Sequence, residues 1–210
     1  KKNLLLLCIG LLLSTFSFAQ LTANFEDQVV PPSSPYNDIA ITGWLNHMSE
    51  GTRAWQAREY NTNKYAQLSA YNSTDASNVA WLITPGLNFS AAGAKALSFD
   101  YNSGYDNGFG LAVLYSNNFD GSNVAGATWT DITSSFTIPT NSSTGYGTFA
   151  SAGTLDVSSY TGTVYFAFRY TGAATGVTTT VQIDNISVTG VAVGIEETMF
   201  NTTVYPNPVQ

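Results

Sequence analysis

The chain has 210 residues, of which 44% are apolar, 13% aromatic and only 10% charged, whereas an ordinary globular domain carries about 25% charged residues. Seven basic and 14 acidic residues give a formal net charge of −7, and such an anionic chain is not expected to bind nucleic acid or an anionic membrane. One Cys and one His exclude a disulfide framework and a zinc site built from Cys and His ligands.

Residues 1–19 have the anatomy of a secretory signal peptide. Two lysines are followed by an apolar run from Leu4 to Leu13 and by small residues that end at Ala19. The run is too short for a transmembrane helix, which needs about 20 apolar residues. We expect cleavage after Ala19, which removes Cys8, leaves a formal charge of about −9 (five basic against 14 acidic residues) and leaves no membrane span.

The rest of the chain shows the pattern of an all-β protein. From Leu21 onward no helical periodicity is sustained, and short apolar or aromatic runs alternate with Gly, Asn, Ser, Thr and Pro. This pattern is typical of a β-sandwich or barrel, and we expect a single domain over residues 20–190. The expected strands are 22–26, 41–47, 53–59, 64–70, 79–84, 95–101, 109–116, 128–136, 162–171 and 178–189.

Three of these strands alternate clearly between apolar and polar residues. Because successive side chains of a strand point to opposite faces, we expect the apolar stripes to form the inner faces of a sandwich. A sugar-stacking role for one stripe is the alternative. The stripes are Leu97, Phe99 and Tyr101; Leu111, Val113 and Tyr115; and Val164, Phe166, Phe168 and Tyr170.

The last expected strand breaks its own alternation. Its apolar residues are odd-numbered through Ile183 and even-numbered from Ile186. A bulge or a change of buried face is therefore expected near Asp184 and Asn185. Because a bulge redirects side chains, Asp184 is a candidate for a carboxylate that faces a specific partner. The alternative is an ordinary bend capped by Asp and Asn.

Five short motifs occur in a particular order along the chain. They are Asn24-Phe25-Glu26, Gly43-Trp44, Trp81-Leu82-Ile83-Thr84-Pro85, Leu97-Ser98-Phe99-Asp100-Tyr101 and Ile183-Asp184-Asn185-Ile186. This order resembles the cleaved-adhesin and choice-of-anchor J domains of Bacteroidota surface proteins. The resemblance covers about residues 21–190 and implies a jelly-roll-like β-sandwich of the galactose-binding-like or adhesin type on a secreted or cell-surface protein.

The same resemblance implies a structural calcium ion between the first and last strands. Carried over by position, its ligands are Glu26 and Asp184, with Asp27 as an additional candidate. Calcium binds six to eight oxygen atoms, so carboxylates from both ends of the domain suit it. The alternative is that the acids lie on solvated strand edges.

The tail carries a second resemblance. Val204-Tyr205-Pro206-Asn207-Pro208 resembles the opening of the sorting domain that directs proteins of the same bacteria to type IX secretion. We therefore expect residues 191–210 to be a linker and the start of such a domain, with the secretion machinery as a partner and more chain after Gln210. A turn-rich tail is the alternative.

No motif for catalysis occurs in these residues. The sequence lacks G-x-S-x-G, H-E-x-x-H and a phosphate loop, and His47 has no triad partner in the sequence and is expected at the surface or a strand edge. A carboxylate pair of the glycosidase type stays open. We expect a domain without catalysis. The alternatives are an accessory domain of a secreted protease or glycosidase, and a purely structural surface protein.

A carbohydrate-binding role has more support, because aromatic residues occur in polar surroundings. Trp55 and Tyr60, with Arg53 and Arg58 beside them, are the candidates for a surface site. Aromatic rings stack on sugars while arginine donates hydrogen bonds to them. The expected partner is a polysaccharide or a protein of a host or matrix surface.

Overall fold

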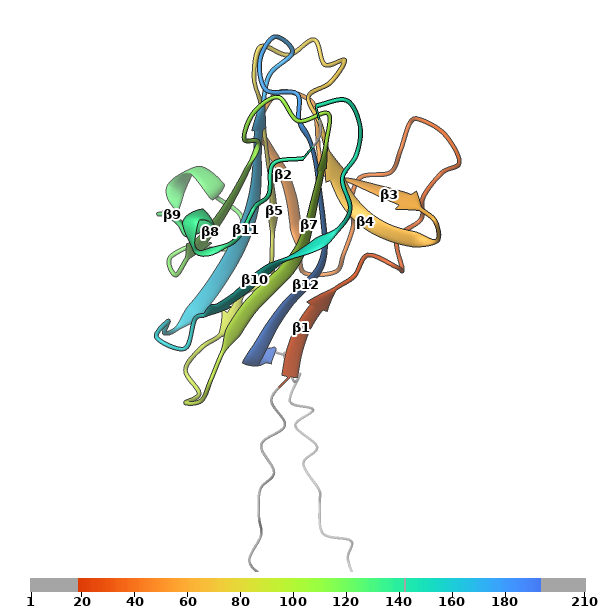
Figure 1. The fold of residues 1–210 in the computed structure, drawn as a ribbon. Helices are drawn as coiled ribbons and strands as arrows, with labels where there is room; N and C mark the ends of the chain where they lie inside the picture. Colours follow the sequence, from red (N-terminus) through yellow and green to blue (C-terminus); the bar gives the residue numbers. More distant parts are fainter. Residues whose placement is uncertain (1–18, 142, 194–210) are drawn as a thin grey trace, which may run out of the picture.

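Alternating apolar residues fold the chain into two antiparallel β-sheets that pack face to face (Figure 1). The computed structural model describes residues 19–141 and 143–193. The predicted fold class, an all-β jelly-roll-like sandwich, is confirmed. The predicted signal peptide, apart from Ala19, and the predicted sorting motif lie outside the described residues.

The two sheets are joined at one end by the short strand β6. The first sheet contains β1 (Ala19–Ala23), β3 (Gln56–Tyr60), β4 (Asn63–Leu68), β7 (Ala96–Gly104), β10 (Ala150–Asp156) and β12 (Thr180–Val193). The second sheet contains β2 (Leu45–Glu50), β5 (Asn78–Ile83), β8 (Leu111–Ser116), β9 (Thr130–Asp131) and β11 (Thr163–Gly172). β6 (Leu87–Asn88) pairs with both β11 and β12.

Two short 3-10 helices, η1 (Val124–Gly126) and η2 (Thr133–Ser135), lie beside the second sheet. No helix in the described part of the chain is long and apolar enough to span a membrane.

The long strand β12 organises the first sheet. On one side it pairs with β7, and on the other it pairs first with β4 and then with β1. Ala19 lies opposite Val191, so the first and last described strands leave the sandwich at the same end (Figure 1). The β3–β4 hairpin projects from the sheet on the same side of β12 as β1 (Figure 1).

The predicted apolar stripes form the core between the sheets. Nine of their ten members are buried, and Phe99 packs edge-to-face on Phe168 with 5.0 Å between ring centroids. Tyr115 is only half-buried and stacks on Tyr160 at 4.2 Å, at the margin of the core. The inner faces of the sandwich are thus confirmed at these positions.

The predicted irregularity in the last strand is also confirmed. The pairing of β12 with β7 shifts register between Asp184 and Ser187, and Asn185 has a φ of 49°. This bulge lets Ile183 and Ile186 both lie in the core, where each is fully buried.

One predicted strand is wrong, and β6 and β10 were missed. Residues 128–136 do not form one strand, because the Asp131 carboxylate accepts a hydrogen bond from the Thr133 amide at 2.8 Å and turns the chain into η2 after the two-residue strand β9. β10 was not predicted, since its sequence is rich in small and polar residues and it pairs with β7 alone at the sheet edge.

Replacing Phe168 by Ala tests the core. The ring is fully buried, so we expect the free energy of unfolding in urea to fall by about 3–5 kcal/mol. Phe109→Ala is the matched control, since 58% of that side chain is exposed and its loss should change stability by about 0.5 kcal/mol or less. Equal losses from the two variants would contradict the assigned core.

Candidate functional site

A cavity of about 1160 Å³ lies over the outer face of the first sheet. Strands β3, β4, β7 and β12 form its floor, and the segments around residues 30–36 and 146–149 form its walls. We call this cavity the groove. Its aromatic lining residues are Tyr36, Tyr60, Tyr65, Tyr146 and Phe149. Its main polar lining residues are Arg58, Gln67, Asn102, Gln182 and Asp184.

A row of amide side chains forms the floor of the groove. Gln67, Gln182 and Asn102 lie side by side on β4, β12 and β7, because the register places Gln182 opposite both neighbours. Asn102 Nδ2 donates to Gln182 Oε1 at 2.6 Å, and Gln182 Nε2 donates to Gln67 Oε1 at 2.7 Å. All three residues are buried. Buried polar groups need such partners, so the row holds the amides in one orientation.

Asp184 is the next groove-facing residue of β12, and its carboxylate is held by two donors. Asn63 Nδ2 donates to Oδ2 at 3.0 Å and the Asn185 amide donates to Oδ1 at 2.7 Å. Burial raises the pKa of Asp184, and the negative charges of Asp100 and Glu26 act in the same direction. The fold therefore keeps a carboxylate in the groove although its charged form is disfavoured there.

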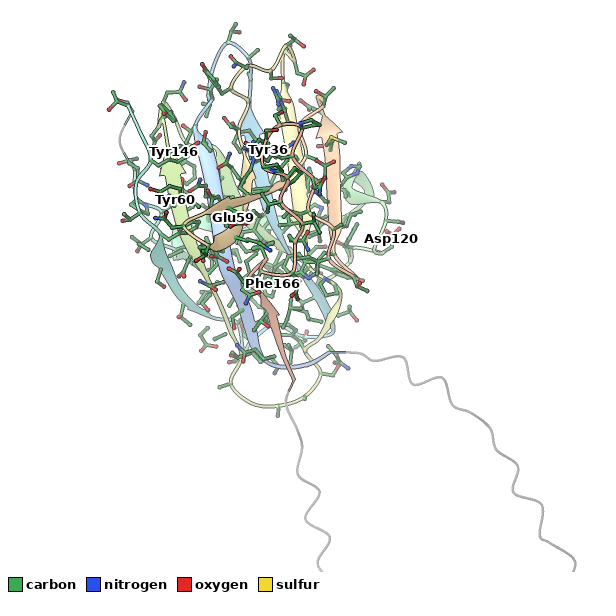
Figure 2. All side chains as sticks on the ribbon, turned by 90° about the vertical axis from the view of Figure 1, so that its right-hand side faces the viewer. Tyr36, Glu59, Tyr60, Asp120, Tyr146 and Phe166 are labelled. Carbon is green, nitrogen blue, oxygen red and sulfur yellow. The ribbon has the colours of Figure 1, made fainter. Side chains whose placement is uncertain are left out.

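Exposed tyrosines stand above this polar floor. Tyr60 and Tyr146 are 71% and 51% exposed. Figure 2 shows Tyr36, Tyr60 and Tyr146 around the β3–β4 hairpin, with Asp120 far away on the other side of the molecule. The hairpin turns at Asn61 and Thr62, which both have positive φ. Two-residue turns of this kind match the twist of the strands on either side.

Tyr146 sits directly on a glycine. A Cβ added to Gly104 would lie 2.4 Å from Cδ1 of Tyr146, so any larger residue there would displace the ring. The Tyr146 ring also meets Tyr105 edge-to-face at 5.3 Å. Gly104 therefore allows the close approach that sets Tyr146 at the edge of the groove.

Arg58, on β3, packs against the ring of Tyr36. Its guanidinium carbon is 3.4 Å from the centre of the Tyr36 ring, and Nη2 donates to Gln56 Oε1 at 3.2 Å. Burial lowers the pKa of Arg58, while the Tyr36 hydroxyl favours its charged form. The arginine is thus half-buried and faces the groove with part of its hydrogen-bonding capacity in use.

The structure brings together only part of the predicted sugar site. Tyr60 and Arg58 line the groove. Arg53 lies in an adjoining cavity, where its Nη2 donates to the carbonyl oxygen of Asn72 at 2.9 Å. The prediction of Trp55 as a stacking residue is wrong, because its ring is fully buried between the sheets and its Nε1 donates to the carbonyl oxygen of Ala80.

Of the predicted calcium ligands, only Asp184 lines the groove. Glu26 and Asp27 are exposed in the segment after β1, whereas Asp184 is buried. The Lys64 ammonium donates to the carbonyl oxygens of Glu26 at 2.8 Å and Gln28 at 3.0 Å. Within residues 19–141 and 143–193, no group of three or more His, Cys, Asp or Glu residues could hold a metal ion. Backbone carbonyl oxygens beside the predicted ligands are thus bound by a lysine ammonium group, and calcium binding stays a prediction.

His47 lies on β2, at the end of the strand order of the second sheet, and is half-buried. The predicted strand-edge position is confirmed. The sequence reasoning missed the amide row. The signal for the row was the polar alternation opposite the apolar stripes, at Asn102 and Gln182, although the pairing of those strands could not be read from one sequence.

Comparison with known proteins assigns the chain to a family. Residues 84–205 match the family model described as a domain of unknown function, DUF5017. The match covers more than half of the chain, so the protein belongs to the DUF5017 family. No curated protein matches the sequence.

Solved structures share the fold. The K1 cleaved adhesin domain of Lys-gingipain from Porphyromonas gingivalis W83 is similar over 81% of this chain and 97% of that domain, with 17% identity and a TM-score of 0.51. The K3 cleaved adhesin domain of the same protein is similar over 82% of this chain and 99% of that domain, with 16% identity and a TM-score of 0.50. At these identities the similarity shows a common fold alone.

Asp184→Asn tests the electrostatics of the groove. The pKa of Asp184 is higher in the folded than in the unfolded chain, so the charged carboxylate lowers the stability of the fold at every pH above both pKa values. This loss of stability disappears as the pH falls below the ordinary aspartate pKa of about 3.9, where the group is protonated in both states. In a buffer that contains EDTA, we expect the Asn variant to have a higher Tm than the parent at pH 7 and an equal Tm at pH 3.5.

Asp120→Asn is the control of opposite sign. Hydrogen bonds from the Asn123 amide, and then from Ser122, lower the pKa of Asp120. That variant should have a lower Tm than the parent at pH 7. A lower Tm for Asp184→Asn at pH 7 would contradict the assigned cost of the buried carboxylate.

Proposed function

We propose that this member of the DUF5017 family is a secreted or cell-surface adhesion module that binds polysaccharide in the groove. The observation that carries the proposal is the pairing of exposed tyrosine rings with a floor of oriented amides and a carboxylate. A sugar needs both kinds of surface, because one face of its ring is apolar and its edge carries hydroxyl groups.

The tyrosines provide the apolar part of this recognition. Tyr60 and Tyr146 expose rings that a sugar can cover, and tyrosine offers a large contact area while keeping a polar hydroxyl at its tip. Tyr36 is held from below by Arg58, so its ring presents a fixed wall. Rigid rings lose little conformational freedom on binding, which favours affinity.

The floor provides the polar part. Each amide offers donors and acceptors, and the Asp184 carboxylate accepts hydrogen bonds from hydroxyl groups. The hydrogen bonds between Asn102, Gln182 and Gln67 fix these groups before a ligand arrives. A ligand pocket usually measures about 300–1000 Å³, so a groove of about 1160 Å³ has room for more than one sugar ring.

The adhesion part of the proposal is supported by the gingipain domains that share the fold, which are named adhesin domains. Export by the signal peptide and the type IX route, and the absence of catalysis, stay predictions from the sequence. The alternative ligand, a protein of a host or matrix surface, is an outcome of the experiment below.

Pull-down on insoluble polysaccharides tests the proposal, with cellulose, chitin, xylan, mannan and cross-linked polygalacturonate beside collagen and fibronectin. We expect retention on at least one polysaccharide. Tyr60→Ala should weaken that binding about tenfold or more, because the loss of an aromatic contact within an interface costs about 1.4 kcal/mol or more at such positions.

Phe109→Ala is the matched control, since Phe109 is also a largely exposed aromatic residue but does not line the groove. That variant should bind as the parent does. Retention on none of the polysaccharides, or retention that Tyr60→Ala leaves unchanged, would contradict the proposed function. Binding to collagen or fibronectin alone would favour the protein-ligand alternative.

The structural calcium ion, with Glu26, Asp27 and Asp184 as its suggested ligands, also stays a prediction. A thermal melt in calcium and in EDTA tests it, because a metal that binds only the folded state raises Tm. If calcium stabilises the chain, EDTA should lower the Tm and Asp184→Asn should abolish the difference. Equal Tm values in calcium and EDTA would contradict the prediction.

A further inference from the structure

A second cavity continues the groove along the strands. Its volume is about 570 Å³, and it shares Arg58, Gln67 and Tyr146 with the groove. It extends toward Thr178 and Thr180, near the start of β12. We call it the side cavity. Groove and side cavity therefore form one continuous surface across the outer face of the first sheet.

The charges on this surface are unevenly distributed. The side cavity is lined by Arg53 and Arg58, and none of the described residues that line it is acidic. The groove also contains Glu59 and Asp184. A ligand that spans both parts therefore meets Arg53 at one end, Arg58 where the two cavities join, and carboxylates at the other end.

The two arginines are a large part of the positive charge of the described chain. The described residues contain five basic residues, Arg53, Arg58, Lys64, Lys95 and Arg169. The two lysines use their ammonium groups on backbone carbonyl oxygens. Arg169 lies on β11 in the other sheet, 5.2 Å from the centre of the Trp81 ring. In a chain of net charge −7, two of these five basic side chains thus meet in one cavity.

Arg58 has hydrogen-bonding capacity that its surroundings do not use. Its Nε is buried, and no acceptor among the described residues lies within reach of it. The groups that favour the charge of Arg58 are the hydroxyls of Tyr36, Tyr146 and Tyr65. The Nε of Arg169 is unpaired in the same way. What distinguishes Arg58 is its place in the lining of both cavities, where the terminal nitrogens of its guanidinium group can donate to a charged acceptor.

We infer that the ligand is an acidic polysaccharide whose carboxylate or sulfate group binds Arg58 and Arg53 in the side cavity. This inference rests on the proposed function, and it names the class of glycan. The planar guanidinium group matches the two oxygens of a carboxylate or sulfate. The neutral faces of the adjoining sugar units lie against the tyrosines, with Tyr71 and Tyr105 in the side cavity and Tyr60 in the groove.

Because of the net charge of the protein, an acidic ligand can be recognised only through direct contacts. A chain of net charge −7 repels an acidic polymer at long range, so the whole-protein field does not favour binding. The preference for an acidic ligand must therefore come from direct contacts with the two arginines. One substitution at Arg58 should remove most of it.

Matched glycans that differ only in charge test the inference. Affinity electrophoresis of the whole chain would compare polygalacturonate with its methyl ester, alginate with its propylene glycol ester, and heparin with desulfated, carboxyl-reduced heparin. We expect at least one acidic member to bind about tenfold or more tightly than its neutral partner, since a hydrogen bond to a charged group contributes at least that much.

Arg58→Gln and Arg53→Gln should each reduce this preference about tenfold, whereas Arg58→Lys should keep part of it. Arg169→Gln is the matched control, because it removes the same charge from the opposite sheet, and it should leave the preference unchanged. A circular dichroism melt shows whether each variant is folded, and the Arg53 variant provides a second test if Arg58→Gln does not fold.

The two proposals fail in different ways. Equal binding of neutral and acidic partners, with Tyr60→Ala still weakening both, would overturn the acidic-ligand inference and leave the proposed function standing. Loss of preference in Arg169→Gln would also overturn it, since net charge would then explain the effect. Binding to none of the neutral or acidic glycans would overturn both.

Discussion

The bulge in β12 is the constraint on which both the core and the groove depend. Before the bulge the odd-numbered Val181 and Ile183 point into the core, and after it the even-numbered Ile186 and Val188 do so. A strand with strict alternation would have put one of these pairs on the outer face. The same strand carries Asp184 outward at the turning point, next to the donors that hold its carboxylate. The bulge thus lets a single strand contribute both to the core between the sheets and to the floor of the groove.

The groove follows from the pairing of the strands on both sides of β12. Because Gln182 lies opposite both Gln67 and Asn102, three amides meet in one row and satisfy one another while buried. Gly104 then allows Tyr146 to cover the adjacent backbone. An acid kept in this place at a cost in stability is typical of a functional site, because structural positions rarely retain a disfavoured charge.

The sequence predicted the sandwich better than the site. Alternation identified buried stripes such as Val164 to Tyr170, and its interruption located the bulge, because both depend on one strand alone. The prediction for Trp55 failed because polar neighbours in the sequence do not show whether a side chain is covered in three dimensions, and this ring, just before β3, is fully buried. The amide row could not be predicted, since it depends on pairing between residues that are 80 and 115 positions apart in the sequence.

The most direct test of the groove is to map where a glycan binds on the folded chain. Backbone amide chemical shifts would be followed by NMR while a soluble oligosaccharide of the retained polysaccharide is titrated into the protein. The account predicts that the shifts concentrate at Tyr60, Tyr146 and Gln182, on the outer face of the first sheet. Shifts confined to the outer face of the second sheet, around Trp81, would contradict it.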